Sequence, residues 1–350
     1  MRLTKSAQLL LLCTAVCRCA SLTPLASHSN VTNSNSLAAL PLVDVFIFNS
    51  EEEMLRYRIR LHSRVFSRFV VVESNITFSG NFKRLHAHDA VAKLERHHRS
   101  LDITILQIPL APAQPAESQH KVRAAFSRET QQRVFLNAYI LEHFPRHTIF
   151  FSDVDELLDP RTLASELTTN PTSDCITTSL RPFYYGESCQ YMRRWDFGVV
   201  LRSDGQTFAK IVRAGAELRK SQVVSRSCPT TKHFVGWHFS YAMDTESIAQ
   251  KLRDFSHASD TSVGVPKILA LSQHKGALHQ YIEDKVMHCR DLFGRTGEVS
   301  LQLRAHDGVL PPVLGWPRHP LAPSSLYSLC SPWNDTYRLI GAPLPTECTS

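Results

Sequence analysis

Short apolar runs that alternate with amphipathic segments constrain the fold of this chain most. Four runs are rich in β-branched and aromatic residues, as buried strands are. They are Val43–Phe48, Phe69–Val72, Ile103–Ile108 and Thr148–Phe151. Helices are expected at Glu51–Leu61, with acidic residues in its first turn, and at about 122–144. This order predicts an α/β fold with a Rossmann-like, mostly parallel sheet and helices on both faces.

The second half of the chain changes character, because its strand patterns are no longer separated by long helices. Strands are expected at Asp174–Tyr185, Phe197–Leu201, Phe208–Val212 and Phe234–Tyr241. Amphipathic helices follow at about 245–257 and 266–287. We therefore expect one continuous domain over residues 42–310, parallel in its first half and mixed in its second. Residues 311–350 are rich in proline and are interpreted as an irregular tail.

An acidic motif ends the fourth apolar run. Thr148–Phe151 is followed by Ser152-Asp153-Val154-Asp155-Glu156. Two carboxylates one residue apart at the carboxyl end of a buried strand lie where open α/β sheets bind ligands. A Mg²⁺ or Mn²⁺ ion held by one or two carboxylates usually has a substrate phosphate as another ligand. The motif predicts metal-assisted chemistry on a phosphate-bearing substrate, with a solvated turn as the alternative.

The N-terminus has the order of a secretory signal. Arg2 and Lys5 precede the apolar run Ala7–Val16, and small residues follow it. The run has about half the length of a membrane-spanning helix. Residues 1–20 are therefore interpreted as a cleaved signal peptide or, alternatively, a short signal anchor, and membrane contact is expected only through that anchor. Residues 21–41, rich in Ser, Thr, Asn and Ala, are interpreted as a flexible stem.

Cysteine usage agrees with a secretory route. Three of the nine cysteines lie in the signal, and six remain: Cys175, Cys189, Cys228, Cys289, Cys330 and Cys348. An oxidising compartment permits disulfides, and the sequence does not choose among their pairings. There is no Cys-x-x-Cys pair, so a zinc site is not expected. Asn30, Asn75 and Asn334 begin sequons and are candidate glycosylation sites.

The net charge of the chain indicates which class of ligand it attracts. The chain has 39 basic and 32 acidic residues, a net charge of +7 that is spread along the sequence. This excess favours anionic ligands such as nucleotide diphosphates, with general solubility as the alternative. No segment resembles a nucleic-acid-binding module, so no nucleic-acid partner is expected.

Further segments, in order from about residue 43 to 295, carry a family resemblance. They are Val43–Ser50 with Glu53, Phe69–Gly80, Glu129 with Gln132-Arg133, Ser152–Glu156, Phe183-Tyr184-Tyr185, Trp195, Gly236–Tyr241, Lys251-Leu252, Phe255-Ser256-His257 and Asp291–Arg295. Together they resemble glycosyltransferase family 17, which contains the bisecting β-1,4-N-acetylglucosaminyltransferases of N-glycan processing. The strings VESNITFSG and GWHFSY are the most specific. The resemblance implies a GT-A-type fold, a UDP-sugar donor, Mn²⁺ or Mg²⁺, and inversion at the anomeric carbon.

The departures from the family pattern come late in the chain. The loop after His257 and the tail from Leu310 match nothing in that pattern. These regions are expected to shape the acceptor site, so the resemblance does not establish the acceptor.

The resemblance also gives the acidic motif its roles. Asp155 would ligate the metal, and Asp153 would ligate it through water or hold the ribose. A metal that bridges both phosphates would neutralise the charge developing on the departing UDP. His238 is a candidate additional ligand, with a hydrogen-bonded core histidine as the alternative. Glu156 would support the two aspartates or cap the next helix.

Other residues are candidates for donor and sugar contacts. Glu73 follows the second strand and would contact uridine or ribose. Arg133 is expected to reach a diphosphate with its planar guanidinium, whereas a solvated helix face is the alternative for it and for Arg128. Trp195 and Trp237 are candidates for stacking on a sugar ring, with core packing as the alternative.

An inverting transferase needs a group that accepts the proton of the acceptor hydroxyl, and a carboxylate is expected in this role. Candidates from the second half of the chain are Glu187, Asp196, Asp244 and Asp254. Asp244 is favoured because it closely follows the GWHFSY string.

These observations predict a metal-dependent inverting glycosyltransferase of the secretory pathway, in the Golgi lumen or secreted after signal cleavage. It would move N-acetylglucosamine from UDP-N-acetylglucosamine to a glycan or glycoprotein, with the core β-mannose of N-glycans as the first candidate. One alternative is the same fold with another donor or acceptor. The other is a secreted glycan-binding protein without turnover, which the presence of both aspartates disfavours.

Overall fold

The computed structural model describes residues 37, 40–95, 101–112, 120–169, 173–187, 189–216, 222–295 and 301–303. All of them belong to the compact unit Asn35–Ser350. Several predictions lie outside the described residues: the signal, most of the stem, the Pro-rich tail, Cys330, Cys348, and the sequons at Asn30 and Asn334. Within the described part of the chain, no helix is both long and apolar enough to cross a membrane.

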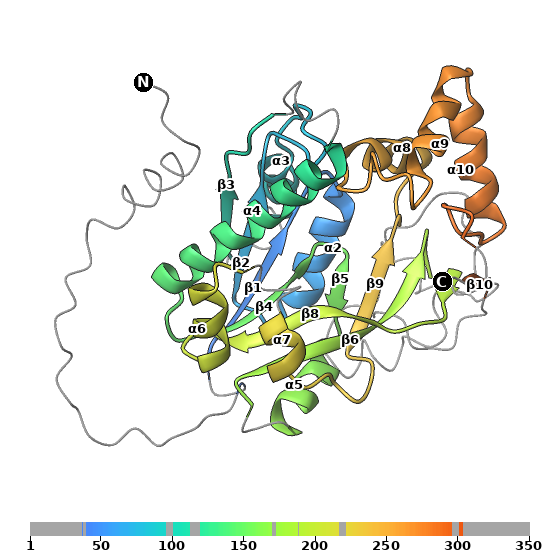
Figure 1. The fold of residues 1–350 in the computed structure, drawn as a ribbon. Coiled ribbons are helices and arrows are strands. Elements are labelled where there is room, and N and C mark those ends of the chain that lie inside the picture. The colour runs from blue at the N-terminus through green and yellow to red at the C-terminus, as the bar shows by residue number, and fades with distance from the viewer. Residues whose placement is uncertain are drawn as a thin grey trace, which may run out of the picture. The chain divides into compact units, whose positions relative to one another are not determined.

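Four parallel strands form the first half of the sheet. They are β1 (Leu42–Ile47), β2 (Arg68–Glu73), β3 (Asp102–Gln107) and β4 (Thr148–Asp153), in the spatial order β4-β1-β2-β3. Three helices connect them: α2 (Glu52–His62), α3 (Ala87–Glu95) and α4 (Lys121–His143) (Figure 1). Ile47 pairs with both Val72 and Asp153, so the carboxyl ends of β1, β2 and β4 meet at one edge.

The second half of the sheet is mixed. Its elements are β5 (Glu156–Leu158), α5 (Pro160–Thr169), β6 (Cys175–Tyr184), β7 (Cys189–Tyr191), β8 (Trp195–Arg202), α6 (Gln206–Arg213), α7 (Gln222–Ser227), β9 (Gly236–Ser240) and β10 (Leu301–Leu303). β8 is antiparallel to both β4 and β6, which joins the two halves. β9 is parallel to β6 and antiparallel to β5, whereas β7 and β10 extend the far end of the sheet.

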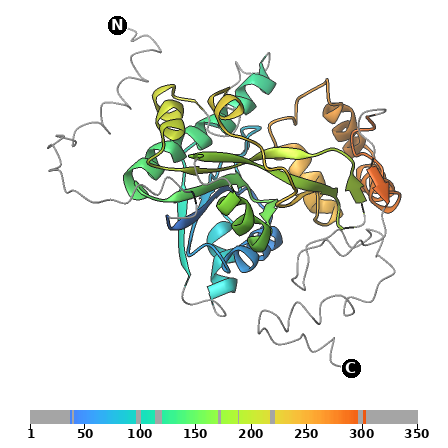
Figure 2. The ribbon, with the colours of Figure 1, turned by 90° about the horizontal axis from the view of Figure 1, so that it is seen from below.

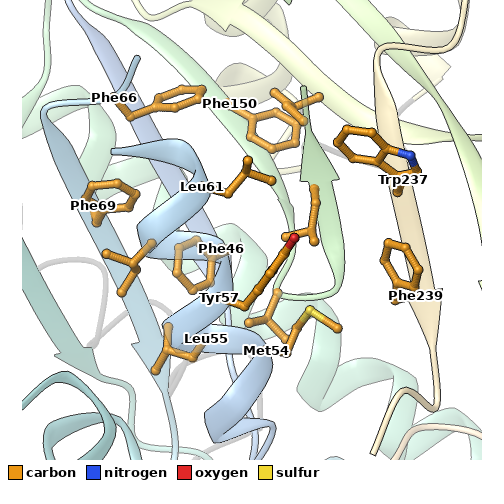
Figure 3. Packing of buried hydrophobic residues seen from close by; sticks show 14 of the residues in the cluster. Phe46, Met54, Leu55, Tyr57, Leu61, Phe66, Phe69, Phe150, Trp237 and Phe239 are labelled. Carbon is orange, nitrogen blue, oxygen red and sulfur yellow. The ribbon is translucent and has the colours of Figure 1, made fainter. Parts of the chain in front are cut away.

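Side chains that alternate along the parallel strands fill a core on each face of the sheet. On one face, Phe46 and Phe150 pack with α2, α3 and α5. Figure 3 shows Leu55 of α2 beside Phe46, with Trp237 and Phe239 of β9 beyond. On the other face, Val43, Val45 and their neighbours pack with α4, α6 and α7. Figure 2 shows helices on both faces of the sheet. The expected α/β class is confirmed: a mixed sheet, parallel in its first half, with helices on both faces.

The strand predicted at Phe208–Val212 is wrong, because these residues lie in helix α6. Thr207, Phe208 and Ile211 are its buried residues, which is a helical spacing. The Asp174 carboxylate accepts hydrogen bonds from the backbone N and Oγ1 of Thr207 and so caps the first turn. A short apolar run does not by itself distinguish a strand from a buried helix, and the cap came from a residue 33 positions away.

The helices of the C-terminal part also differ from the sequence prediction. They are α8 (Thr245–Asp254), α9 (Val265–Ala270), the 3₁₀ turn η3 (Leu271–Gln273) and α10 (Ala277–Met287). The single helix expected over 266–287 is therefore interrupted, and Gly276 adopts the left-handed conformation (φ 77°) just before α10. Helices α3, α5 and α7 have no counterpart in the sequence prediction.

Two disulfides cross-link strands and helices in the second half of the chain. Cys175 of β6 is bonded to Cys228 at the end of α7, and Cys189 of β7 is bonded to Cys289 after α10. A third core joins α8, α9 and α10 to Tyr184 and other residues of the sheet edge. The expected use of these cysteines in disulfides is confirmed for these four. The C-terminal helices are thus held beside β9, at the edge where the candidate site lies.

Candidate functional site

A cavity of about 380 Å³ lies at the carboxyl edge of the parallel strands. It is bounded by the ends of β1 and β4, the first half of α4, and residues of β8, β9, α8 and the segment after α8. Four carboxylates line it: Glu51, Glu129, Asp153 and Asp155. The motif predicted from the sequence therefore lies in a cavity rather than in a solvated turn.

The acidic motif is a tight connection between β4 and β5, and Glu156 closes it. Oε2 of Glu156 accepts a hydrogen bond from the backbone N of Asp153 (3.2 Å), and Oε1 accepts one from Nε1 of Trp195 (2.6 Å). Glu156 thus supports the turn. The alternative that it caps the next helix is wrong, because β5 follows and Asp159 caps α5.

A buried arginine that was not predicted from the sequence binds the backbone of this turn. Arg58 of α2 is fully buried and donates to the carbonyl oxygens of Asp153 (2.5 Å) and Glu156 (2.8 Å). It also binds both carboxylate oxygens of Asp44 (2.9 and 2.5 Å). Its guanidinium lies 4.2 Å from the ring centre of Phe46. A charge at this depth is tolerable only because it is paired and hydrogen-bonded throughout.

His62 completes this buried network. Its Nδ1 lies 2.7 Å from Oδ2 of Asp44, and its Nε2 accepts a hydrogen bond from the backbone N of Leu158 (2.8 Å). The proton is therefore on Nδ1, and the ring is neutral. Burial lowers the pKa of His62 more than Asp44 raises it. Burial raises the pKa of Asp44, but Arg58 and His62 hold it below its usual value. The network fixes both ends of the Asp153–Leu158 segment.

Lys251 of α8 reaches the second aspartate. Its Nζ lies 3.2 Å from Oδ2 of Asp155 and 3.1 Å from Oε1 of Glu51. Burial lowers the pKa of Lys251, but the two carboxylates outweigh this and raise it above its ordinary value. Burial likewise raises the pKa of Glu51, whereas Lys251 and backbone N–H groups lower it. Lys251 and Glu51 are therefore charged, and the contacts of Lys251 connect α8 to the parallel half of the sheet.

His238 faces the same aspartate from β9. Its Nε2 lies 3.7 Å from Oδ1 of Asp155, and its ring stacks on Trp195 at a centroid distance of 3.9 Å. The pairing of β5 with β9 sets His238 opposite Glu156. This close approach requires Gly236, because a Cβ there would lie 1.9 Å from the carbonyl oxygen of Leu157.

The first aspartate is bound by α4. Nη2 of Arg133 lies 2.7 Å from Oδ1 of Asp153 and 3.2 Å from Oε1 of Glu129. Arg133 and Arg128 are both buried, which excludes the solvated helix face. Arg128 instead donates to the carbonyl oxygens of Ala111 and Phe78. Phe126, Glu129 and Arg133 of α4 thus line the cavity, whereas Leu136 and Ile140 further along the helix pack on the sheet.

The residues around Asp155 fit a divalent cation. Two neighbouring ligands that each lie about 2.1 Å from an octahedral ion are separated by about 3 Å. Oδ1 of Asp155 and Nε2 of His238 lie 3.7 Å apart, so a small side-chain shift would bring both onto one ion. No group of three or more potential ligands occurs in the part of the chain that the structure describes. An Mg²⁺ or Mn²⁺ ion that keeps several waters and binds substrate phosphates needs no more protein ligands than these.

Glu73 has a structural role at the start of α3. Its carboxylate is fully buried and accepts hydrogen bonds from Nζ of Lys83 (2.6 Å) and from the backbone N of His86 and Ala87 (2.8 and 2.9 Å). It caps the start of α3 and is not among the residues that line the cavity. Its expected contact with uridine or ribose remains a prediction.

The four carboxylates predicted as the catalytic base do not line the cavity, and they remain predictions that the geometry does not favour. Asp244 is exposed and caps α8 by accepting from the backbone N of Ser247 (2.7 Å). Asp254 is buried and accepts from Nε2 of Gln250 (2.8 Å). Asp196 is exposed on β8, and Glu187 lies in the turn between β6 and β7.

Aromatic side chains form much of the remaining wall. Phe78, Phe126, Trp195, Phe197 and Phe255 line the cavity, and Phe197 is 41% exposed. Trp237, by contrast, packs in the core. No role in the site was predicted for Phe126, Phe197, Lys251 or Glu51. Lys251 and Phe255 do belong to segments of the family resemblance, which is the signal that pointed to this wall.

Comparison with known proteins gives a family. The sequence profile of glycosyltransferase family 17 matches residues 28–298, which is most of the chain. No curated protein matches the chain.

Solved structures show only remote similarity. The mannosyltransferase PcManGT from Pyrobaculum calidifontis, in complex with GDP-Man and Mn²⁺, is 10% identical with a TM-score of 0.36, and the match covers 65% of this chain and 66% of that one. TarS 1–349 from S. aureus is 10% identical with a TM-score of 0.33, and 71% of this chain and 84% of that one are covered. At these scores the similarities carry no argument about function.

Proposed function

The chain belongs to glycosyltransferase family 17, and on that premise we propose that it is a metal-dependent inverting transferase that uses UDP-N-acetylglucosamine. The acceptor would be a glycan or glycoprotein, with the core β-mannose of N-glycans as the first candidate. The observation that carries the proposal is the placement of Asp153 and Asp155. They lie in one cavity at the carboxyl end of β4, each beside a basic side chain.

In this proposal the charged and the aromatic side chains of the cavity have different roles. A cation held by Asp155 and His238, with Asp153 reaching it through water, would supply a Lewis acid for the two phosphates of the donor. Arg133 and Lys251 add fixed positive charge where the negative charge of UDP develops. The aromatic wall offers faces for the C–H groups of sugar rings and limits the access of water.

The proposed location is the secretory pathway, in the Golgi lumen or outside the cell. Two disulfides, Cys175–Cys228 and Cys189–Cys289, support an oxidising compartment.

Hydrolysis of UDP-N-acetylglucosamine with Mn²⁺ and with EDTA tests the catalytic part. We expect turnover that depends on Mn²⁺ and falls about 100-fold or more in Asp155→Asn. Asp159→Asn is the matched control, since Asp159 caps α5 a few residues away and does not line the cavity. Retained turnover in a folded Asp155→Asn variant contradicts the proposal. UDP binding without any turnover points to a glycan-binding protein instead.

A second candidate is a transferase that needs no metal. The contact between Nζ of Lys251 and Asp155 favours it, because an ammonium there offers a positive charge close to the phosphates. Turnover that persists in EDTA and is lost in Lys251→Met identifies this case.

A further inference from the structure

The carboxylates of the cavity are already engaged with cations. Glu51 and Asp155 share Lys251, and Glu129 and Asp153 share Arg133. A neighbouring cation makes a carboxylate a weaker proton acceptor. The group that takes the proton of the acceptor hydroxyl is therefore to be sought among the other residues of the cavity wall.

A histidine–aspartate pair lies on that wall, just after α8. His257 lines the cavity with its side chain 40% exposed, and its Nδ1 lies 3.0 Å from Oδ2 of Asp260. The other oxygen of Asp260 accepts from the backbone N (2.9 Å) and Oγ (2.6 Å) of Ser262, which fixes the carboxylate. Ser262 and then His257 lower the pKa of Asp260, so it is ionised. Neutral His257 accordingly carries its proton on Nδ1 and offers Nε2 as an acceptor.

His257 contacts α4 about two helical turns before the arginine that binds the acidic turn. The ring of His257 meets Phe126 of α4 edge-on at a centroid distance of 4.9 Å. Phe126 precedes Arg133 by seven residues, or about 10 Å along the helix axis. Arg133 binds Asp153, where the diphosphate is expected, so His257 is placed to face the acceptor rather than the phosphates. Charged groups that face the cavity from neighbouring elements are Glu129 and Arg133 of α4, Lys251 of α8, Glu51, Asp153 and Asp155.

We propose that Nε2 of His257 is the general base of the transfer and that Asp260 positions its ring. As the acceptor oxygen bonds to C1 of the sugar, the bond from C1 to the phosphate oxygen breaks and UDP leaves with that electron pair. The hydroxyl proton passes to Nε2, and Asp260 stabilises the imidazolium. This inference rests on the proposed function and names the base of that same site.

Transfer from UDP-N-acetylglucosamine to a biantennary N-glycan, measured beside UDP binding, tests the proposal. We expect His257→Gln to lower kcat about 100-fold or more with UDP affinity unchanged. His279→Gln is the matched control: its Nε2 lies 2.7 Å from Glu246, its side chain is 42% exposed, and it does not line the cavity. Asp260→Asn should move the acid limb of the kcat/KM profile to lower pH, because the lost carboxylate no longer favours the imidazolium.

Three results overturn the inference. A His257→Gln variant within about threefold of the wild-type kcat shows that another group takes the proton. A loss of UDP affinity that matches the loss of transfer makes His257 a donor-binding residue. A wild-type protein that binds UDP but transfers nothing overturns the proposed function, and this inference with it. In the first two cases transfer by the wild-type protein still stands, so the two failures are distinguishable.

Discussion

Arg58 shows how much one buried side chain contributes to the acidic turn. It neutralises the fully buried Asp44 and binds the carbonyl oxygens of Asp153 and Glu156. Arg58→Met leaves Asp44 buried without its cation, which costs about 3–5 kcal/mol of the free energy of unfolding. Urea unfolding measures this. Arg56→Met on the same helix is the control, since its ion pair with Glu52 (3.8 Å) is partly exposed and contributes less than about 1 kcal/mol.

His62 makes stability depend on pH. Its pKa in the folded protein lies below the ordinary value of 6.5, so the unfolded chain binds more protons between the two values. The free energy of unfolding should therefore fall as the pH drops from about 7 to 5, by at most about 1.4 kcal/mol per pH unit from this residue. Denaturant titrations at several pH values should give a shallower slope for His62→Gln. An identical slope would show that His62 does not titrate in this range.

Helices and strands were predictable to different degrees. The parallel strands and α4 followed from apolar runs and helical spacing, because both faces of that part of the sheet are buried. Helix α6 was not predictable, since its cap Asp174 and its packing partners lie far away in the sequence. The residues of the candidate site were likewise predictable to different degrees. Asp153 and Asp155 were found as a motif, whereas Glu51, Lys251 and the Arg58 network depend on contacts between distant segments.

The disulfide between β7 and the end of α10 should matter for the site as well as for stability. Replacing Cys189 and Cys289 by alanine opens a link across 100 residues and should cost about 2–5 kcal/mol. Because α8 carries Lys251, which contacts Asp155, UDP affinity should fall too. The control is the pair Cys175 and Cys228, which fastens α7 outside the cavity wall. Its loss should lower stability without a comparable change in UDP affinity, as calorimetry can show.

The cavity as a whole depends on Lys251, which connects α8 to Glu51 and Asp155 of the parallel half. Lys251→Met leaves two buried carboxylates together, and we expect a loss of about 3–5 kcal/mol. Mn²⁺ should restore part of it, because an ion that binds only the folded protein raises its stability. Thermal melts with Mn²⁺ and with EDTA measure the difference. Lys267→Met, at an exposed position, is the control for the loss of a lysine. A Lys251→Met variant whose melting temperature is the same with Mn²⁺ as with EDTA would contradict a cation site at Asp155.

Transfer of N-acetylglucosamine to a defined N-glycan, read by mass spectrometry of the product, is the decisive measurement of the proposed activity. We expect the wild-type protein with Mn²⁺ to add one N-acetylhexosamine residue from UDP-N-acetylglucosamine, and folded Asp155→Asn to add none. A folded wild-type protein that binds UDP but adds no sugar from any UDP-sugar to any glycan, with or without Mn²⁺, would contradict the proposed activity.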